Sequence, residues 1–260
     1  MVYTKCMDSF TTVLIIIIAI GVMSVIVFRK KEIELGTSDG VEIIGRLVDL
    51  SGAEDAVIFL HMMPGVKEDY ENLMNILKKE EVSSLAIDLR GHGESEGGPY
   101  GYRNFSETEH QKSIEDVKAA SKYLEKKGYP IDHQYIVGAS IGANLALWFA
   151  SSEASLNKTV LLSPGIDYQG IKGERLMRDL DEDQNVLIVS SDDDKRRSKK
   201  SDDGEEVSWN VEMCKKLIEA APDDVDIKFL EYNEAGHGTD MFDVDEKPDL
   251  ETEILQFLND

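Results

Sequence analysis

Residues 135–147 read Tyr135-Ile136-Val137-Gly138-Ala139-Ser140-Ile141-Gly142-Ala143-Asn144-Leu145-Ala146-Leu147. An apolar, strand-like run ends in Gly-Ala-Ser-Ile-Gly and continues directly into an apolar pattern typical of a helix. This G-x-S-x-G context is typical of a serine on a sharp turn between a strand and a helix. Glycines at 138 and 142 remove side chains that would clash there, and the helix N-terminus offers unpaired N–H groups. The stretch therefore predicts a nucleophile, Ser140, if the chain also supplies a base, an acid and a second N–H donor.

The length allows one large α/β domain or two small ones, and the composition argues against nucleic-acid binding. The chain has 260 residues, of which 42% are hydrophobic and 30% are charged, so it can form a packed core. Its formal net charge is −23, and phosphates need lysine and arginine partners, so no nucleic acid is expected among its partners. The two cysteines, Cys6 and Cys214, fall before an apolar segment and within a predicted helix, so we expect no structural disulfide.

The segment from Thr11 to Phe28 is apolar and carries no charge, which is typical of a helix that spans a bilayer. It ends in Arg29-Lys30-Lys31 rather than in a small-residue cleavage site, which favours an uncleaved anchor over a signal peptide. These basic residues outnumber the single Lys5 before the segment, so the positive-inside rule places the globular part in the cytoplasm. We therefore predict a single-pass membrane protein, with an anchor over 1–31 and a globular domain over 32–260.

Strand-like and helix-like segments alternate through that domain. Residues 31–50 predict a β-hairpin with its turn at 37–40. Further strands are predicted at Ala56–His61, Ser84–Asp88, His133–Val137, Lys158–Leu162, Asn185–Val189 and Val225–Tyr232. Helices are predicted at Glu68–Lys79, Glu107–Lys127, Ile141–Ser151, Val207–Ala221 and Pro248–Leu258. Apolar strands separated by helices indicate a mostly parallel sheet with helices on both faces and an antiparallel hairpin at one edge.

Between the predicted strands at 158–162 and 185–189 lie only about two dozen residues, too few for a separate cap domain.

A carboxylate and a histidine follow the serine in the order Ser, Asp, His. Asp192, Asp193 and Asp194 come directly after the strand at 185–189, at the end where catalytic groups sit in such sheets. Any one of the three could orient an imidazole. After the next strand, Glu234-Ala235-Gly236-His237-Gly238 places a histidine between two glycines in a loop, with no apolar face to pack. His237 is thus predicted to be the general base that takes the serine proton.

The other four histidines are predicted to be structural. His110 is expected on an exposed helix face, and His133 at the opposite end of the strand that leads to the serine. His61 is expected to brace the loop that follows its strand, and His92 to join a network within the loop 88–95.

A tetrahedral intermediate needs two N–H donors for its oxyanion. One is predicted to be the backbone of Ile141, directly after the nucleophile. The other is expected in His61-Met62-Met63-Pro64-Gly65, where Pro64 has no N–H to give. Met63 is the preferred donor and Met62 is the alternative.

One low-complexity segment, Ser191–Ser208, reads SDDDKRRSKKSDDGEEVS. Its charges cluster by sign and it holds almost no apolar residue, so it predicts a solvated loop. Its carboxylates lack the spacing of a cation-binding loop, and no metal or cofactor site is predicted.

Four stretches together resemble the α/β-hydrolase family, specifically its small, cap-less, dienelactone-hydrolase-like and esterase-like members. They are His61-Met-Met-Pro-Gly65, Asp88-Leu-Arg-Gly-His-Gly-Glu-Ser95, Gly138-Ala-Ser-Ile-Gly-Ala-Asn144 and Ala235-Gly-His-Gly238. The resemblance covers 32–260 and implies a single α/β-hydrolase domain with a Ser–Asp–His triad. In family members the acid usually lies three residues after a glycine that ends the strand. Ser191 stands in that glycine's place, so the resemblance implies Asp194 as the acid, with Asp193 and Asp192 as alternatives.

These patterns predict a membrane-anchored serine hydrolase that cleaves a carboxylic ester or thioester through an acyl-enzyme on Ser140. No metal or organic cofactor is expected. The expected substrate is a small-molecule ester, a thioester or a lipid-like molecule, the last suggested by the predicted anchor alone. Two alternatives stay open: a peptidase of the same fold, and a non-catalytic binding or scaffolding protein built on it.

Overall fold

The computed structural model describes residues 31–194, 199–200, 206–207, 209–244 and 249–260. From Lys31 onward the chain forms one compact unit. No helix in these ranges is long and apolar enough to cross a membrane. The anchor predicted at 11–28 lies outside the described residues.

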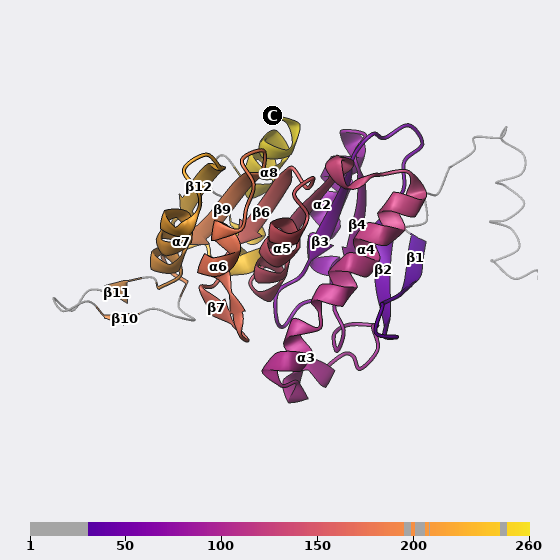
Figure 1. Ribbon diagram of the computed structural model, residues 1–260, viewed down its shortest axis with the longest axis horizontal. Coiled ribbons are helices and arrows are strands. Elements are labelled where there is room, and N and C mark those ends of the chain that lie inside the picture. Colours follow the sequence, from indigo (N-terminus) through magenta and orange to yellow (C-terminus); the bar gives the residue numbers. More distant parts are fainter. Residues whose placement is uncertain (1–30, 195–198, 201–205, 208, 245–248) are drawn as a thin grey trace, which may run out of the picture. The chain divides into compact units, whose positions relative to one another are not determined.

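An eight-stranded sheet forms the centre of the unit, in the order β1-β2-β4-β3-β5-β6-β9-β12 (Figure 1). Its strands are β1 (Lys31–Gly36), β2 (Glu42–Val48), β3 (Ala56–Leu60), β4 (Ser83–Ile87), β5 (Gln134–Ala139), β6 (Lys158–Leu162), β9 (Asn185–Ser191) and β12 (Asp226–Tyr232). β1 pairs antiparallel with β2, and β2 pairs antiparallel with β4. All other pairs are parallel, so the predicted sheet and its antiparallel edge hairpin are confirmed.

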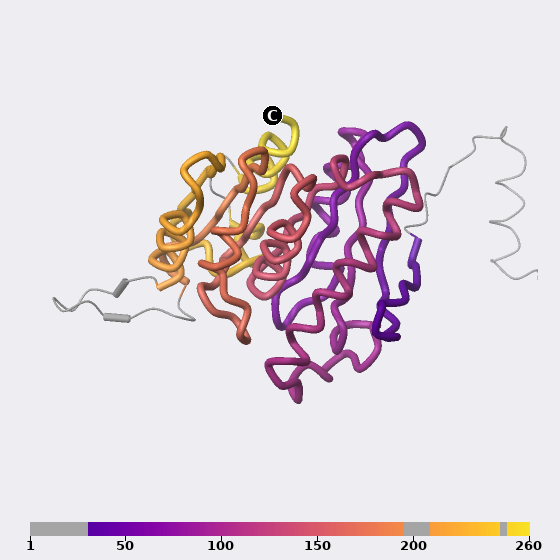
Figure 2. Tube along the Cα trace, viewed as in Figure 1, coloured from indigo at the N-terminus to yellow at the C-terminus, as the bar shows by residue number. Residues whose placement is uncertain are grey.

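Helices cover both faces of the sheet because the strands are apolar on both sides. Along β3, Ala56, Ile58 and Leu60 belong to one buried cluster, whereas Val57 and Phe59 belong to a second. The first cluster includes side chains of α4 (Ile114–Lys127), α5 (Ile141–Ser152) and α7 (Trp209–Ala220); the second includes α2 (Glu71–Lys79) and α8 (Leu250–Asn259). Figure 1 and the trace in Figure 2 show these two helical layers on opposite sides of the strands.

Two predicted elements differ from the structure. The single helix expected over 107–127 is divided into α3 (Glu107–Gln111) and α4, with Lys112 and Ser113 between them. Ser106 caps α3 by accepting a hydrogen bond from the Glu109 N–H, which is a strong local start signal. Within 191–208, where a loop was predicted, β10 (Lys199–Lys200) pairs antiparallel with β11 (Glu206–Val207).

The segment between β6 and β9 holds more structure than the sequence predicted. It contains a small antiparallel hairpin, β7 (Asp167–Tyr168) with β8 (Ile171–Lys172), followed by α6 (Gly173–Arg178). Gly170 forms the turn with φ +78, and a Cβ there would lie 2.4 Å from the Gln111 side chain. The hairpin is therefore held close against α3.

Candidate active site

Ser140 occupies the sharp turn between β5 and α5 with a strained backbone, φ 52 and ψ −114. Its N–H donates to the Leu162 carbonyl at 2.8 Å, which fixes the turn to the end of β6. A Cβ on Gly138 would lie 2.1 Å from the Gly142 carbonyl oxygen. One on Gly142 would lie 2.3 Å from the Leu60 carbonyl oxygen. The two glycines are thus required by the close approach of α5 to the ends of β5 and β3, as the sequence predicted.

A histidine and a carboxylate meet beyond the ends of β9 and β12. His237 Nδ1 and Asp194 Oδ2 are 2.6 Å apart, within the range of a strong charge-assisted hydrogen bond. Asp194 is 1% exposed, so this bond is shielded from water. With Nδ1 engaged, the Nε2 atom of His237 is left to exchange a proton with another group.

All three aspartates of the 192–194 run contact the histidine loop, each in a different way. Asp192 Oδ1 accepts the Glu234 N–H, and Asp193 Oδ1 accepts the Gly236 N–H, both at 2.8 Å. Among the described residues only Asp194 reaches the imidazole. The run therefore holds the histidine loop through its first two members and orients the ring through its third.

One cavity of about 240 Å³ joins the predicted site residues. It is lined by Met63, Ser140, Ser163, Gly165, Tyr168, Asp194, Asn210, Met213 and His237. No hydrogen bond joins Ser140 to His237 within the described part of the chain. Such bonds are often long in the free state of an enzyme and shorten when substrate binds. The arrangement places a hydroxyl, an imidazole and a buried carboxylate around one space.

Met63 and Ile141 are the residues whose N–H groups are predicted to hold the oxyanion. Ile141 is the first residue of α5, and Met63 lines the cavity. Neither N–H finds an acceptor among the described residues. The side chain of Met62, the alternative donor, is 7% exposed, packs into the core and does not line this cavity. Met63 and Ile141 therefore stay the predicted pair, with Met62 as the alternative.

His61 braces the loop that carries Met63, as the sequence predicted. The side chain is fully buried; its Nδ1 lies 2.7 Å from the Met62 carbonyl and its Nε2 lies 3.0 Å from the Leu89 nitrogen. Because a backbone N–H can only donate, Nε2 accepts and Nδ1 carries the proton. This neutral ring ties the end of β3 to the end of β4.

The remaining histidine predictions have mixed outcomes. His92 Nδ1 bonds the Arg90 carbonyl at 3.1 Å within its own loop, and His133 precedes β5 at the end opposite the serine, so both placements are confirmed. The exposed position predicted for His110 is wrong: it is 5% exposed and packs edge-on against Phe105. Phe105 comes from the loop that precedes α3 and covers this histidine, a contact that the polar neighbours of His110 in the sequence do not indicate.

Buried histidines should make the fold sensitive to acid. Burial, followed by the neighbouring His61, lowers the pKa of His92 to about 4, from 6.5 in an unfolded chain. Below pH 6.5 the unfolded chain therefore binds a proton at this position that the folded chain does not. As the pH falls from 6.5 to 4, this single group should therefore lower the free energy of unfolding by about 1.4 kcal/mol per pH unit. Urea unfolding of His92→Asn should show a correspondingly shallower loss of stability toward acid than the wild type.

His133→Asn is the matched control, because that ring is 45% exposed and its pKa is raised by a hydrogen bond to Asp55. We expect this variant to keep the steeper acid loss of the wild type. Equal pH profiles for the wild type and His92→Asn would contradict the prediction.

Five residues that line the cavity were not predicted from the sequence: Ser163, Gly165, Tyr168, Asn210 and Met213. The Ser163 hydroxyl accepts the Gly238 N–H at 2.9 Å, and its backbone is strained with φ 51. Asn210 donates to the Pro164 carbonyl at 3.0 Å and is 2% exposed. Ser163-Pro164-Gly165 directly follows β6, so its position at the carboxyl edge of the sheet was the available signal.

Within the described ranges, one group of three carboxylates lies close enough to share a cation: Glu32, Glu68 and Glu94. Arg46 pairs with the first two, and the Lys67 ammonium lies 2.6 Å from Glu94. None of these residues lines the cavity that holds Ser140. These ion pairs with Arg46 and Lys67 explain why the three carboxylates lie close together.

Comparison with known proteins identifies the family. The family model described as "Serine aminopeptidase, S33" matches residues 52–222. An AB hydrolase superfamily protein, YisY of Bacillus subtilis (strain 168), is 29% identical over 109 residues, which are 41% of this chain and 37% of YisY. The chain thus matches little more than a third of that relative's length.

Solved structures share the fold at low identity. An esterase of Pyrococcus furiosus, Pf2001, superposes with a TM-score of 0.68 at 21% identity, covering 88% of this chain and 91% of the esterase. Dienelactone hydrolase from Anabaena variabilis gives a TM-score of 0.64 at 17% identity, covering 88% of this chain and 94% of that enzyme. The chain belongs to the serine aminopeptidase S33 family and has the α/β-hydrolase fold.

Proposed function

We propose that this hydrolase is a serine esterase that cleaves carboxylic ester or thioester bonds through an acyl-enzyme on Ser140. One observation carries the proposal: the buried Asp194–His237 pair and the strained Ser140 turn line the same cavity. The esterases and the dienelactone hydrolase among the structural neighbours are consistent with it.

In this mechanism the Ser140 hydroxyl attacks the carbonyl carbon while His237 Nε2 takes its proton. The N–H groups of Met63 and Ile141 stabilise the oxyanion of the tetrahedral intermediate. The intermediate collapses as His237 returns the proton to the departing alcohol or thiol. Water then attacks the acyl-enzyme by the same route, and Asp194 keeps the imidazole oriented and stabilises its charged form throughout.

The cavity favours a compact acyl group. Met63, Tyr168 and Met213 give it apolar surface, while Ser163 and Asn210 are already committed to backbone hydrogen bonds. Its volume of about 240 Å³ lies below the roughly 300–1,000 Å³ that is usual for a small-molecule site. Short-chain esters are therefore the preferred substrates under this proposal. A lipid-like ester would fit only if it placed no more than its scissile end in the cavity.

A peptidase is the second candidate, because the matching family model is described as a serine aminopeptidase. A panel of p-nitrophenyl esters beside aminoacyl p-nitroanilides separates the two. Turnover of the esters with little turnover of the anilides supports the esterase; the reverse preference favours the peptidase.

Covalent labelling tests whether the chain is a serine hydrolase at all. A fluorophosphonate should label the wild type at Ser140, as located by peptide mass mapping, because the hydroxyl is activated by His237. The Ser140→Ala variant should remain unlabelled. Folded wild-type protein that takes up no label would favour a non-catalytic role for the fold.

The membrane anchor and cytoplasmic orientation are also proposals, supported by the sequence of 11–28 and the basic residues after it. The full chain should stay with membranes after an alkaline carbonate wash. Protease added outside intact cells should leave the hydrolase domain whole. Release by carbonate contradicts the anchor, and digestion from outside contradicts the orientation.

A further inference from the structure

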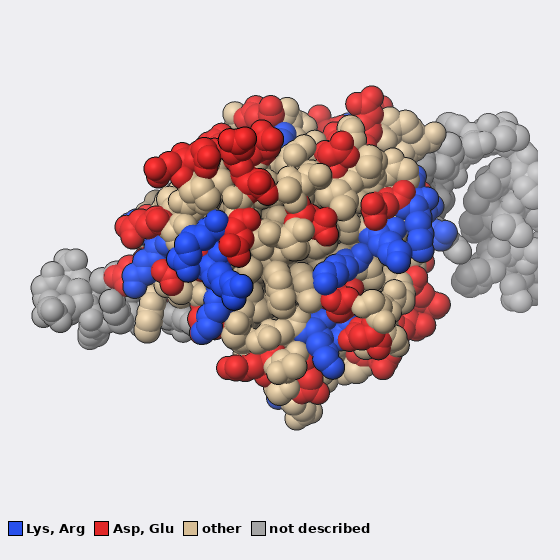
Figure 3. All heavy atoms as spheres, in the orientation of Figure 1, with Lys and Arg blue, Asp and Glu red and all other residues tan. Residues whose placement is uncertain are grey.

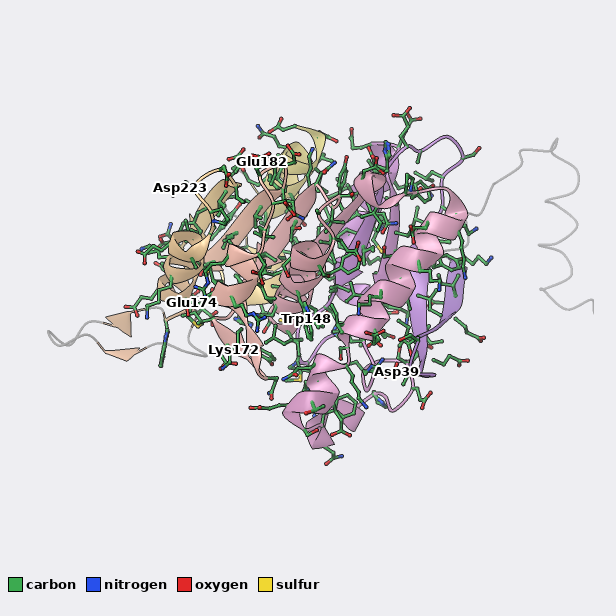
Figure 4. The ribbon with its side chains drawn as sticks, viewed as in Figure 1. Asp39, Trp148, Lys172, Glu174, Glu182 and Asp223 are labelled. Carbon is green, nitrogen blue, oxygen red and sulfur yellow. The ribbon has the colours of Figure 1, made fainter. Side chains whose placement is uncertain are left out.

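A second cavity, of about 410 Å³, lies outside the catalytic one and shares no lining residue with it. It is formed by α3, the C-terminal half of α5, the β7–β8 hairpin and α6. Its lining residues are Gln111, Trp148, Ser151, Ser152, Gly170, Ile171, Lys172, Arg175, Leu176 and Asp179. Figure 4 labels Trp148 on α5 and Lys172 near the hairpin on this face of the molecule. A cavity of this size is in the usual range for a small-molecule site.

The lining of this cavity has more basic than acidic residues, unlike the chain as a whole. Asp and Glu outnumber Lys and Arg by 51 to 28 overall, yet Lys172 and Arg175 face a single carboxylate, Asp179, among the lining residues. In Figure 3 blue side chains gather over the region of α6, beside a tan surface. The cavity is therefore less acidic than the chain as a whole, so it should repel an anion less than the rest of the surface does.

Arg175 is the available cation. Lys172 is already paired with Asp167 across the hairpin. In the described part of the chain Arg175 forms no ion pair or hydrogen bond. A guanidinium presents several donors in one plane and binds carboxylates in pairs of hydrogen bonds.

Part of the cavity lining is apolar and includes an aromatic ring. Ile171 is 3% exposed, and Leu176 and Trp148 are partly buried. The hydroxyls of Ser151 and Ser152 donate to backbone carbonyls of α5, so they offer few donors to a ligand. An apolar planar surface beside an unpaired guanidinium matches a molecule with an aromatic body and one anionic group.

We propose that this cavity is a binding site for an aromatic carboxylate, with the carboxylate on Arg175 and the ring system against Trp148 and Ile171. The site does not depend on the esterase proposal, because the β7–β8 hairpin separates it from Ser140. Tyr168, on β7, lines the catalytic cavity, whereas Ile171 and Lys172, on β8, line this one.

Titration calorimetry with 2-naphthoate on the full chain tests the site, with neutral 2-naphthamide as the matched ligand. Wild-type protein should bind the carboxylate at least about tenfold more tightly than the amide, because only the former pairs with a guanidinium. Arg175→Gln should weaken naphthoate binding by a similar factor. Arg178→Gln, on the same helix but outside the cavity, should bind as the wild type does.

Ser140→Ala is the control that separates this proposal from the esterase proposal. It should bind naphthoate as the wild type does, so binding by this variant supports the second site even if no hydrolase activity is found. Loss of binding in Ser140→Ala, or competition by a fluorophosphonate on Ser140, would move the ligand to the catalytic cavity and overturn the proposal. The proposal would also fail if the wild type did not bind naphthoate, or if Arg178→Gln weakened binding as much as Arg175→Gln.

Discussion

Replacing Asp194 by asparagine should lower kcat for ester hydrolysis about 10⁴-fold, the size of effect known for this change in a serine protease triad. The Asp194 carboxylate accepts the proton of His237 Nδ1 at 2.6 Å in a site that is 1% exposed. An amide of the same shape has no negative charge to stabilise the imidazolium, and its NH₂ group favours the wrong tautomer of the ring. Steady-state kinetics with a p-nitrophenyl ester would measure the loss.

Asp192→Asn and Asp193→Asn are the matched controls, because they change the same charge in the same run. Each of these side chains accepts a backbone N–H through Oδ1, and an asparagine Oδ1 can accept it as well. We expect both variants to stay within about tenfold of wild-type kcat, since one hydrogen bond to an uncharged acceptor is worth only about 1 kcal/mol. A larger loss in Asp193→Asn than in Asp194→Asn would reassign the acid.

Replacing Lys67 by methionine should lower the free energy of unfolding by about 3–5 kcal/mol. The ammonium is 1% exposed and lies 2.9 Å from Asp88, which is fully buried. Although burial alone would lower the pKa of Lys67, hydrogen bonds to Glu94 and Asp88 raise it. Methionine fills much of the same space but leaves the Asp88 carboxylate buried without its cation. Urea unfolding at pH 7 would measure the difference.

Lys79→Met, at the exposed end of α2, is the matched control and should change stability by about 0.5 kcal/mol or less. The Asp88 carboxylate also accepts the Lys67 backbone N–H, near the loop that carries Met63, so a shift of this carboxylate after loss of the ammonium should reduce kcat as well as stability. Unfolding free energies that are equal for the two variants would show that the buried pair contributes nothing net.

The sequence predicted the sheet, and it predicted which residues lie around the candidate site, because both depend on local patterns. The serine turn needs glycine at 138 and 142, and the apolar strands between helices define the order of the fold. The placement of His237 followed from its two flanking glycines. These signals are read within a few residues, so they did not require knowledge of the packing.

What the sequence could not predict depends on contacts between distant segments. In the sequence Lys67 is an ordinary lysine just before a predicted helix, and only the fold brings Asp88 and Glu94 into contact with its ammonium. His110 has a polar neighbourhood in the chain, and only the fold brings Phe105 over it. The choice among three consecutive aspartates rests on where the loop at 234–237 crosses them. The small hairpin at 167–172 has strands of two residues, too short for any periodicity to show.

The two edges of the eight-stranded sheet have a consequence for how the protein behaves in a crowded solution. An open edge strand is a template on which another chain can add a strand and start an aggregate. On β1, Glu32 and Glu34 are exposed, and on β12, Lys228 and Glu231 form ion pairs with Glu253 and Lys215. A second copy of the chain also carries a net charge of −23, so it would bring like charge close to these charged edge strands. The edges are thereby protected against self-association, and raising the salt concentration should weaken that protection.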